Sequence, residues 1–485
     1  MKPTYCNPIC VEDVPSARAL DAILGNHDVR TYNDYRSIAD PSVIYHDGKW
    51  IMYPSYSFAY VTEDFVHWKK VDIGLDVKNI RFSPAVVNFR GKWYMSGHGV
   101  SGMYVSDSPL GPFKHCGNIT DVNGNEVRPL DGCYLADGDR LYFYWAKIMR
   151  PENGEDMELV IGTVGVECDP DEPWRFITEP VWINKFSPEK EWERHGEHNQ
   201  NERIGWIEGQ WMIKIDGRYY LLYSGSGTQF ATYATGIVYS DEGPLSGFHR
   251  QQNHDPLTRK PYGLVRGAGH GSIVAGPDNT YWIFYTCLFG YNYKYERRVC
   301  MDVLGIDENG ELYCPELSET PQFAPGVKKN PEKGNSAGLL PLTFMQPASA
   351  SSNTNGREPI YATDDSILTW WQPKPEDTDK TLTIDLGSEK GYYVEALRII
   401  WRDIGMDTLD GINPGAFQYI AEYEDIESGE WKMLVDASEN TRDLCIDYRQ
   451  FEKVTTKKVR LRVLGSPKGI EPGVTSFTVF GKCAH

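Results

Sequence analysis

Short runs in which hydrophobic and polar residues alternate make up most of the first 314 positions, and Gly, Asp, Asn and Pro bound them. Such runs predict short β-strands, because one face of a strand is buried and the other exposed. Five segments share one pattern: a small or polar residue, a strand, a turn of the Asp-Gly or Arg-Gly type, and an aromatic-rich second strand. They begin at Ala39, Phe82, Leu130, Ile207 and Gly269. Each segment is typical of a β-hairpin.

Further strand-like runs follow most of these hairpins, so each repeat offers a unit of roughly four strands. The residues that open the hairpins are Asp40, Ser83, Asp131, Glu208 and His270, at spacings of 43, 48, 77 and 62 residues. Two polar insertions account for the long spacings: PENGEDMELV after the third hairpin and NKFSPEKEWERHGEHNQNERIG before the fourth. Four-stranded units that repeat at about 40–50 residues are typical of a β-propeller. The pattern therefore predicts five blades over residues 1–314.

The pattern changes after the fifth unit. Residues 315–339 are rich in Pro, Gly and charge, which predicts a linker. Strand-like runs resume in residues 340–485, and a unit of this length suits a β-sandwich of the jelly-roll kind. The predicted fold class is all-β: a five-bladed β-propeller followed by a β-sandwich.

The amino-acid composition limits the classes of binding partner that we expect. Lys plus Arg number 49 and Asp plus Glu number 68, a net charge of -19, so we expect no binding to nucleic acid or anionic lipid. No apolar run approaches the roughly 18 residues of a membrane span, so no membrane insertion is expected. An acidic surface does not repel neutral sugars. The 14 Trp and 30 Tyr suit an all-β protein, and they also suit a sugar-binding surface.

The hairpin openings carry the candidate chemistry. The innermost strands of a propeller line its central channel, so equivalent positions of different blades meet there. Three of the five openings are acids, Asp40, Asp131 and Glu208. Because like charges raise one another's pKa, three converging acids indicate catalysis. Carboxyl groups with separated pKa values perform glycoside hydrolysis, in which one donates a proton and another activates water or attacks carbon.

The sequence motifs around these acids resemble those of glycoside hydrolase family 43, whose five-bladed propeller holds an Asp, Asp, Glu trio. In blade order, the matching motifs are ADPSV at Asp40, FSP at Phe82, LDG at Asp131, EGQ at Glu208 and GHGS at His270. Three motifs depart from the family pattern: Gly132 and Gln210 stand where it has proline, and Gly271 stands where it has asparagine.

This resemblance implies a role for each residue. Asp40 would be the general base, Glu208 the general acid, and Asp131 would raise the pKa of Glu208 and orient it. The family inverts the anomeric centre and needs no cofactor for catalysis. His270 would support the site. An Arg near the last blade often faces the sugar, and here Arg297 and Arg298 are the candidates, of which Arg298 is favoured. Supporting or sugar-contacting candidates are Phe82, Ser83, Trp206 and Trp211.

The second unit resembles a discoidin, or coagulation factor 5/8 type C, module, close to carbohydrate-binding module family 32. The matching motifs are SASS at Ser349, ATDDSILTWW at Ala362, LTIDLG at Leu382 and FTVFG at Phe477. The resemblance implies a structural Ca²⁺ at Asp364 and Thr369, although Asp365 replaces the family's glycine. The module would bind sugar or only buttress the propeller.

Three functions remain open on these observations. The first is an inverting exo-acting hydrolase that releases terminal L-arabinofuranose, or D-xylose or D-galactose, from plant-type polysaccharide or oligosaccharide. The second is a non-catalytic carbohydrate-binding propeller protein. The third is a retaining β-fructosidase, which ADPSV disfavours because it lacks the Asn and Gly of that group's first motif. No signal peptide is visible at the N-terminus. We expect a secreted or periplasmic protein if such a peptide has been removed, and a cytoplasmic one otherwise. Neither the oligomeric state nor the disulfide state of the ten cysteines follows from the sequence.

Overall fold

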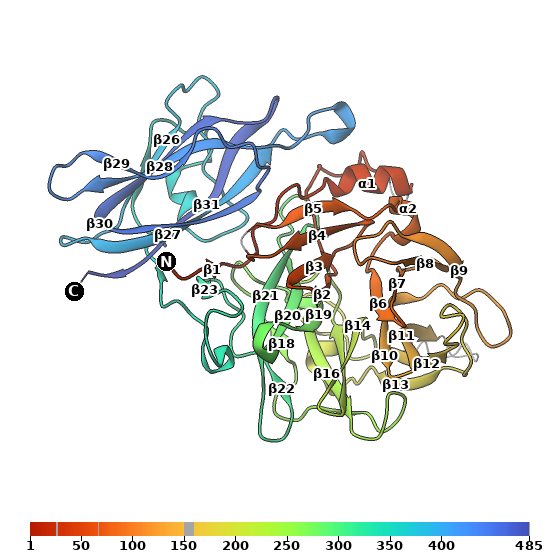
Figure 1. The fold of residues 1–485 in the computed structure, drawn as a ribbon. Helices are drawn as coiled ribbons and strands as arrows, with labels where there is room; N and C mark the ends of the chain where they lie inside the picture. Colours follow the sequence, from red (N-terminus) through yellow and green to blue (C-terminus); the bar gives the residue numbers. More distant parts are fainter. Residues whose placement is uncertain (26–27, 66, 150–159, 485) are drawn as a thin grey trace.

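The computed structural model describes residues 1–25, 28–65, 67–149 and 160–484. It is built almost wholly of β-strands, as predicted, and Figure 1 shows a propeller beside a second β-unit. Two short α-helices, α1 (Ala17–Leu24) and α2 (Val77–Ile80), lie at one edge of the propeller. The insertion predicted at 151–160 lies outside the described residues except for its last position.

Five antiparallel sheets form the blades and confirm the predicted propeller. Blade I is β2 (Ser42–His46), β3 (Lys49–Tyr53), β4 (Phe58–Thr62) and β5 (Lys69–Asp72). Blade II is β6 (Ala85–Phe89), β7 (Lys92–Ser96), β8 (Gly102–Ser106) and β9 (Lys114–Asn118). Blade III is β10 (Leu130–Asp137), β11 (Arg140–Met149), β12 (Val160–Cys168) and β13 (Val181–Lys185). Blade IV is β14 (Ile207–Ile215), β15 (Arg218–Gly225), β16 (Ala234–Ser240), β17 (His249–Arg250) and β18 (Thr258–Arg259). Blade V is β19 (Gly269–Ala275), β20 (Tyr281–Leu288), β21 (Arg297–Ile306) and β22 (Leu312–Tyr313).

Each blade places one residue in the left-handed backbone region where the inner strand begins. These residues are Asp40 (φ 55°), Ser83 (φ 45°), Asp131 (φ 49°), Gly209 (φ 65°) and His270 (φ 41°). The predicted equivalence of Glu208 with the other openings is therefore wrong by one residue, because Gly209 takes that place. Left-handed residues other than glycine cost about 1–3 kcal/mol each and cluster at functional sites.

Side chains of neighbouring blades hold this ring of left-handed residues. The N–H of Asp40 donates to Thr286 Oγ1 at 2.9 Å, and the N–H of His270 donates to Ser224 Oγ at 2.8 Å. The N–H of Gly209 donates to Asp131 Oδ2 at 3.3 Å. Each bond crosses from one blade to the next, so the polar groups that close the propeller also fix the geometry at its axis.

The C-terminal unit is one extended sheet that curls around its own core. Its strands are β24 (Leu340–Pro341), β25 (Ala348–Ala350), β26 (Thr381–Asp385), β27 (Tyr392–Ile404), β28 (Gln418–Asp425), β29 (Trp431–Ala437), β30 (Ile446–Gly465) and β31 (Glu471–Cys483). The strand order is β24-β31-β27-β30-β26-β25, and β28 pairs with β30 and β29. Trp371, Leu397 and Phe477 are among its fully buried side chains.

Short elements lie outside the blades and the large sheet. The predicted linker, 315–339, contains β23 (Gln322–Phe323), which pairs with β1 (Thr4–Tyr5) at the N-terminus. The 3₁₀ turns are η1 (Glu191–Glu193), η2 (Pro277–Asn279), η3 (Pro331–Lys333), η4 (Pro359–Ala362) and η5 (Thr408–Asp410). Of these, η5 belongs to the C-terminal unit and contacts α1 of the propeller.

A buried ion-pair group joins the two units. Arg36, which precedes blade I, donates to both carboxylate oxygens of Asp443 at 2.9 and 2.7 Å, and its Nη1 lies 3.3 Å from Asp403. The Arg36 side chain is 2% exposed. Burial raises the pKa of Asp443, so its ionised form depends on the arginine.

We expect Arg36→Met to lower the free energy of unfolding by about 3–5 kcal/mol, because two buried carboxylates lose their counter-charge. Urea unfolding followed by tryptophan fluorescence measures the change. The matched control is Arg30→Ala, which breaks the solvent-exposed Arg30–Asp410 pair and should leave the unfolding curve unchanged. Equal effects of the two variants would contradict a special contribution of the buried group.

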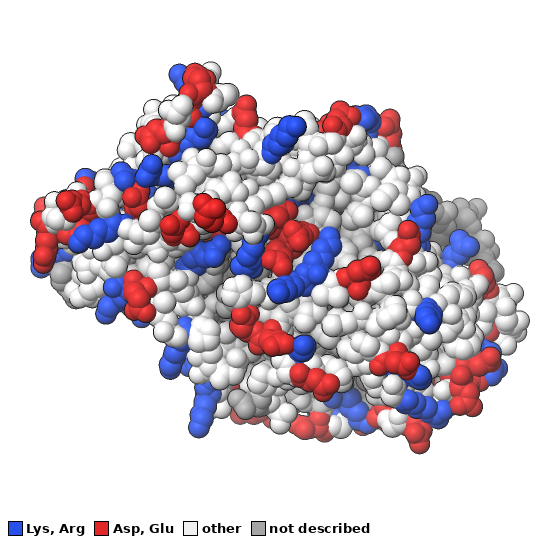
Figure 2. All heavy atoms as spheres, turned by 45° about the horizontal axis from the view of Figure 1, so that its top comes forward, with Lys and Arg blue, Asp and Glu red and all other residues white. Residues whose placement is uncertain are grey.

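On the face drawn in Figure 2, Lys and Arg are interspersed with Asp and Glu. Within the described ranges, neither α-helix has the length and apolar character needed to cross a membrane. All ten cysteines are free thiols.

Candidate active site

One cavity of about 310 Å³ opens at the propeller axis, where the inner strands of the blades begin. Its charged and imidazole lining groups are Asp21, Asp40, Asp131, Glu208, His98, His270 and Arg297. Its aromatic lining groups are Tyr35, Tyr56, Phe82, Tyr293 and Tyr295. The three acids that the sequence singled out therefore share one cavity, although 168 residues separate the first from the last.

Glu208 is half-buried on β14, where it pairs with Ser224. A bulge at Gly209 and Gln210 follows it, and the pairing resumes at Trp211. Trp206 Nε1 donates to Glu208 Oε2 at 2.6 Å, and the Tyr233 hydroxyl donates to its Oε1 at 2.7 Å. Burial raises the pKa of Glu208, and the nearby charge of Asp131 raises it further. This carboxyl group is therefore biased toward its protonated form.

Gly209 lets this bulge approach blade V. Its φ is +65°, and a Cβ there would lie 2.9 Å from Cγ of His270. Any side chain at this position would force His270 away from the axis. This close approach explains why the EGQ motif has a glycine at position 209.

Asp131 has the opposite bias. Its Oδ1 lies 2.6 Å from His98 Nδ1 and its Oδ2 lies 3.7 Å from His270 Nδ1. Burial acts to raise the pKa of Asp131, but the charges of His270 and His98 outweigh it and hold the pKa below its usual range. The same contact raises the pKa of His98 against its burial. Asp131 is thus a carboxylate beside a carboxyl group, and the two titrate apart.

Asp40 sits in a cage of donors. Ser55 Oγ donates to its Oδ2 at 2.5 Å. Arg297 Nη1 lies 3.0 Å from its Oδ1, and His270 Nδ1 lies 3.2 Å from the same oxygen. The other ring nitrogen of His270, Nε2, lies 3.1 Å from Ser83 Oγ. His270 therefore bridges Asp40, Asp131 and Ser83. Its supporting role in the site stays a prediction.

The choice of Arg298 is corrected by these contacts. Arg297 is the arginine in the cavity, where its Nη1 reaches Asp40 and Thr228. Arg298 follows it on β21, so its side chain points to the other face of the strand. There it donates to the carbonyl oxygen of Arg36 and lies over the ring of Phe289.

The aromatic candidates fall into two groups. Phe82 lines the cavity, and Trp206 contacts the proposed acid directly. Trp211 does neither, since its Nε1 donates to the carbonyl oxygen of Ile273 and its ring packs between blades IV and V. The prediction of Trp211 as a sugar platform is therefore wrong.

Several lining residues were missed. The signal for His98 was its place just after the second strand of blade II, where the chain returns to the axis. Asp21 and Tyr35 come from the N-terminal segment, and Tyr293 and Tyr295 from the loop between β20 and β21. These segments lie outside the repeated hairpins, so no repeat could point to them.

The suggested calcium loop closes on itself. The Thr369 hydroxyl donates to Asp364 Oδ2 at 2.7 Å, and the N–H of Ser366 donates to Oδ1 at 3.0 Å. Both carboxylate oxygens are thus already engaged within the loop. Ca²⁺ binding at Asp364 and Thr369 stays a prediction.

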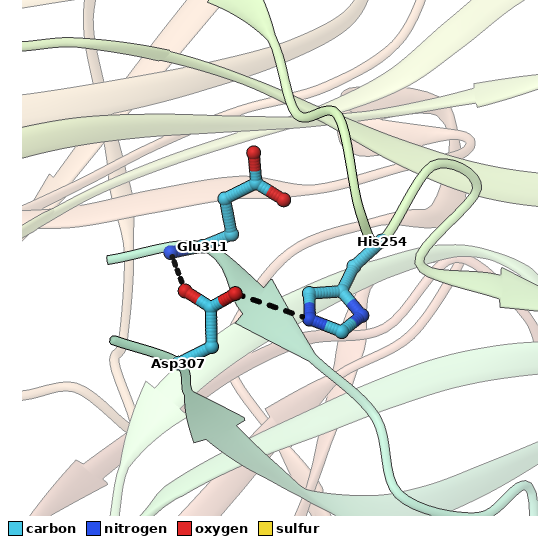
Figure 3. A group of neighbouring side chains, drawn as sticks. All are labelled: His254, Asp307 and Glu311. Atoms are coloured by element: carbon cyan, nitrogen blue, oxygen red, sulfur yellow. Dashed lines mark hydrogen bonds and ion pairs between the residues drawn. The ribbon is translucent and has the colours of Figure 1, made fainter. Parts of the chain in front are cut away.

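In the described part of the chain, one group of three potential metal-ligating side chains lies close together: His254, Asp307 and Glu311 (Figure 3). Asp307 accepts the N–H of Glu311 at 2.8 Å and lies 3.4 Å from His254 Nε2. Glu311 accepts the N–H groups of Gln252 and Asn253, both at 2.8 Å. These contacts hold two turns of blades IV and V together, and nothing else there points to a metal.

Comparison with known proteins identifies the family. Residues 29–312 match the model of glycosyl hydrolases family 43. A beta-D-galactofuranosidase of Aspergillus niger, xynD, is 24% identical over 316 residues, which cover 56% of this chain and 81% of that protein. A solved structure named as a glycoside hydrolase covers 91% of this chain and 97% of its own, with a TM-score of 0.51 and 18% identity. A thermostable family-43 glycoside hydrolase covers 61% and 97%, with a TM-score of 0.50 and 23% identity. At these identities the two structures support the fold, and the family match decides membership: the chain belongs to glycosyl hydrolases family 43.

Proposed function

We propose that this family 43 chain is an inverting, exo-acting glycoside hydrolase that releases terminal L-arabinofuranose, with D-xylose and D-galactose as the alternatives. The observation that carries the proposal is the arrangement of one carboxyl group with a raised pKa, Glu208, and two other acids, Asp131 and Asp40, around a single cavity. Opposite biases in neighbouring acids assign the proton donor and the ionised partners.

In the proposed reaction, Glu208 gives its proton to the glycosidic oxygen as the bond from that oxygen to the anomeric carbon breaks. Asp40 takes a proton from a water molecule whose oxygen bonds to the anomeric carbon on the opposite face. The Trp206 and Tyr233 donors then stabilise the Glu208 carboxylate that remains. Arg297 and Ser55 hold Asp40 in place, and Asp131 stays ionised through His98 and His270.

The cavity supports the exo-acting mode. About 310 Å³ lies at the low end for small-molecule sites, and suits a pocket for a terminal sugar better than a groove for a polymer. Aromatic rings such as Phe82 and Tyr295 offer apolar faces against which a sugar ring can pack. Because the Aspergillus niger relative is named a galactofuranosidase, the furanose form of D-galactose belongs among the test substrates.

The test is a panel of 4-nitrophenyl glycosides: α-L-arabinofuranoside, β-D-xyloside, β-D-galactopyranoside and β-D-galactofuranoside. We expect the enzyme to release nitrophenol from one furanoside above the others. If every glycoside and also arabinan, arabinoxylan and arabinogalactan stay intact while a glycan array binds, the protein is a carbohydrate-binding propeller and the proposal fails.

The pH profile gives a separate prediction for Asp131. Because Glu208 must be protonated to act, kcat/KM should fall as the pH rises through its raised pKa. Asp131→Asn removes the charge that adds to the effect of burial, so the pKa of Glu208 should drop and the alkaline limb should move to lower pH. Profiles of kcat/KM for the wild type and this variant measure the shift. An alkaline limb that stays in place would mean that Asp131 does not tune Glu208.

A further inference from the structure

A fourth carboxylate reaches the cavity from outside the propeller blades. Asp21 lies on α1, whose N-cap is Ser16, and its residue surface is 5% exposed. It lines the same cavity as Asp40, Asp131 and Glu208. Asp21 neither donates nor accepts a proton in the proposed reaction. Burying an acid in a cavity costs free energy unless hydrogen-bond donors contact it.

The aromatic wall holds Asp21 in one orientation. The Tyr32 hydroxyl donates to its Oδ2 at 2.8 Å. The ring of Tyr32 stacks on Tyr293, with centroids 4.3 Å apart and planes 19° apart, and Tyr293 itself lines the cavity. A carboxylate fixed in this way is prepared for a ligand that enters the cavity.

The helix that carries Asp21 is anchored on both sides. The N–H of Ala17 donates to the carbonyl oxygen of Tyr35 at 2.9 Å, next to the cavity wall. Arg18 lies 3.3 Å from Asp407 of the C-terminal unit, just before η5. Thus the C-terminal unit braces the segment that delivers this carboxylate.

Asp21 lies on the Asp40 side of the cavity. The Tyr32 side chain that holds Asp21 stacks on Tyr293. The segment that carries Tyr293 continues to Arg297, whose Nη1 lies 3.0 Å from Asp40 Oδ1. Glu208, in contrast, is bonded to Trp206 and Tyr233. In an inverting reaction the leaving group lies on the side of the general acid. Groups on the side of the general base therefore contact the sugar that is released.

We propose that Asp21 is a substrate-binding residue whose carboxylate accepts hydrogen bonds from hydroxyl groups of the terminal sugar and thereby selects the sugar that is cleaved. A carboxylate only accepts, and sugar hydroxyls donate, so the two are matched. Hydrogen bonds to a charged group are stronger than those between neutral groups. The inference rests on the proposed function and deepens it, since it names a specificity residue of the same site.

The experiment uses the full-length enzyme and the glycoside that the wild type hydrolyses best. Asp21→Asn should lower kcat/KM about 10- to 100-fold, because it replaces a charged acceptor by a neutral one. The factor should be the same for 4-nitrophenyl and 2,4-dinitrophenyl leaving groups, since Asp21 contacts the released sugar. The control is Asp28→Asn, an exposed acid that follows the same helix, which should act like the wild type.

Deoxy analogues of that glycoside identify the hydroxyl group. The wild type should lose activity on the analogue that lacks the contacted hydroxyl, and Asp21→Asn should lose little more on it. Tyr32→Phe keeps the aromatic ring, removes the donor to Asp21 and should lower kcat/KM about three- to tenfold. Thermal unfolding midpoints equal to that of the wild type separate binding from folding.

The outcomes separate the two proposals. A wild type that hydrolyses no glycoside overturns the proposed function and this inference together. An active wild type with an equally active Asp21→Asn, or a loss that depends on the leaving group, overturns this inference alone. An equal loss with both leaving groups that the deoxy analogue abolishes supports it.

Discussion

Glu208→Gln is expected to lower kcat/KM on an unactivated linkage, such as an arabino-oligosaccharide, by about 10²–10⁴-fold, because the departing oxygen loses its proton donor. A 2,4-dinitrophenyl glycoside should lose far less, since its leaving group departs without a proton. Glutamine preserves the size of the side chain, so Trp206 and Tyr233 stay in place around it. Initial rates on both substrates measure the difference.

The control for this variant is Glu189→Gln, an exposed glutamate of the polar segment that precedes blade IV. It removes the same charge at a distance from the cavity and should leave both rates unchanged. An equal loss on activated and unactivated substrates would contradict the assignment of Glu208 as the proton donor. It would instead point to a role in binding.

Asp40→Asn is expected to lower kcat by a similar factor, about 10²–10⁴-fold, but on activated and unactivated substrates alike, because water loses its base. Azide needs no base, so added sodium azide should restore turnover and give a glycosyl azide of inverted configuration. Mass spectrometry and product release measure the rescue. The matched control is Asp47→Asn, an exposed acid in the turn between β2 and β3 of the same blade.

An Asp40→Asn enzyme that keeps its activity would contradict the role of Asp40 as base. A glycosyl azide of retained configuration would contradict inversion. Arg297 and His270 contact Asp40 and are charged or polar, so the variant also needs a thermal midpoint near that of the wild type.

The repeated part of the site was open to prediction, because a propeller brings equivalent positions of its blades to one axis. Asp40, Ser83, Asp131 and His270 share left-handed backbone at the start of their inner strands, as the repeat implies. Glu208 lies one residue before the left-handed position of its blade. Its blade uses Gly209 at the equivalent position, and the β-bulge that places Glu208 is a local irregularity that a spacing count cannot resolve.

The remaining wall of the site could not be predicted, for a physical reason. Asp21 and Tyr293 come from a helix and a loop without counterparts in the other blades, and loops follow no period. The choice between Arg297 and Arg298 needed strand register, since adjacent residues of β21 point to opposite faces. His98 was reachable in principle, because it stands where blade II returns to the axis.

The two-part architecture followed from the change of pattern near residue 340, but the junction did not. Arg36 lies 367 residues from Asp403 and 407 residues from Asp443 in sequence, and the three form one buried group. Only the structure shows that the C-terminal unit also touches α1 through Arg18 and Asp407. The unit therefore supports one wall of the cavity, whether or not it binds sugar.

The most direct test of the central claim is the configuration of the first product. Proton NMR spectra recorded during hydrolysis by the wild type, before mutarotation, show which anomer appears first, with Glu208→Gln run in parallel. Inversion predicts that the anomer opposite to that of the glycoside appears first, and the loss of the proton donor predicts no early product from the variant. A first product of retained configuration, or the same time course with Glu208→Gln, would contradict that claim.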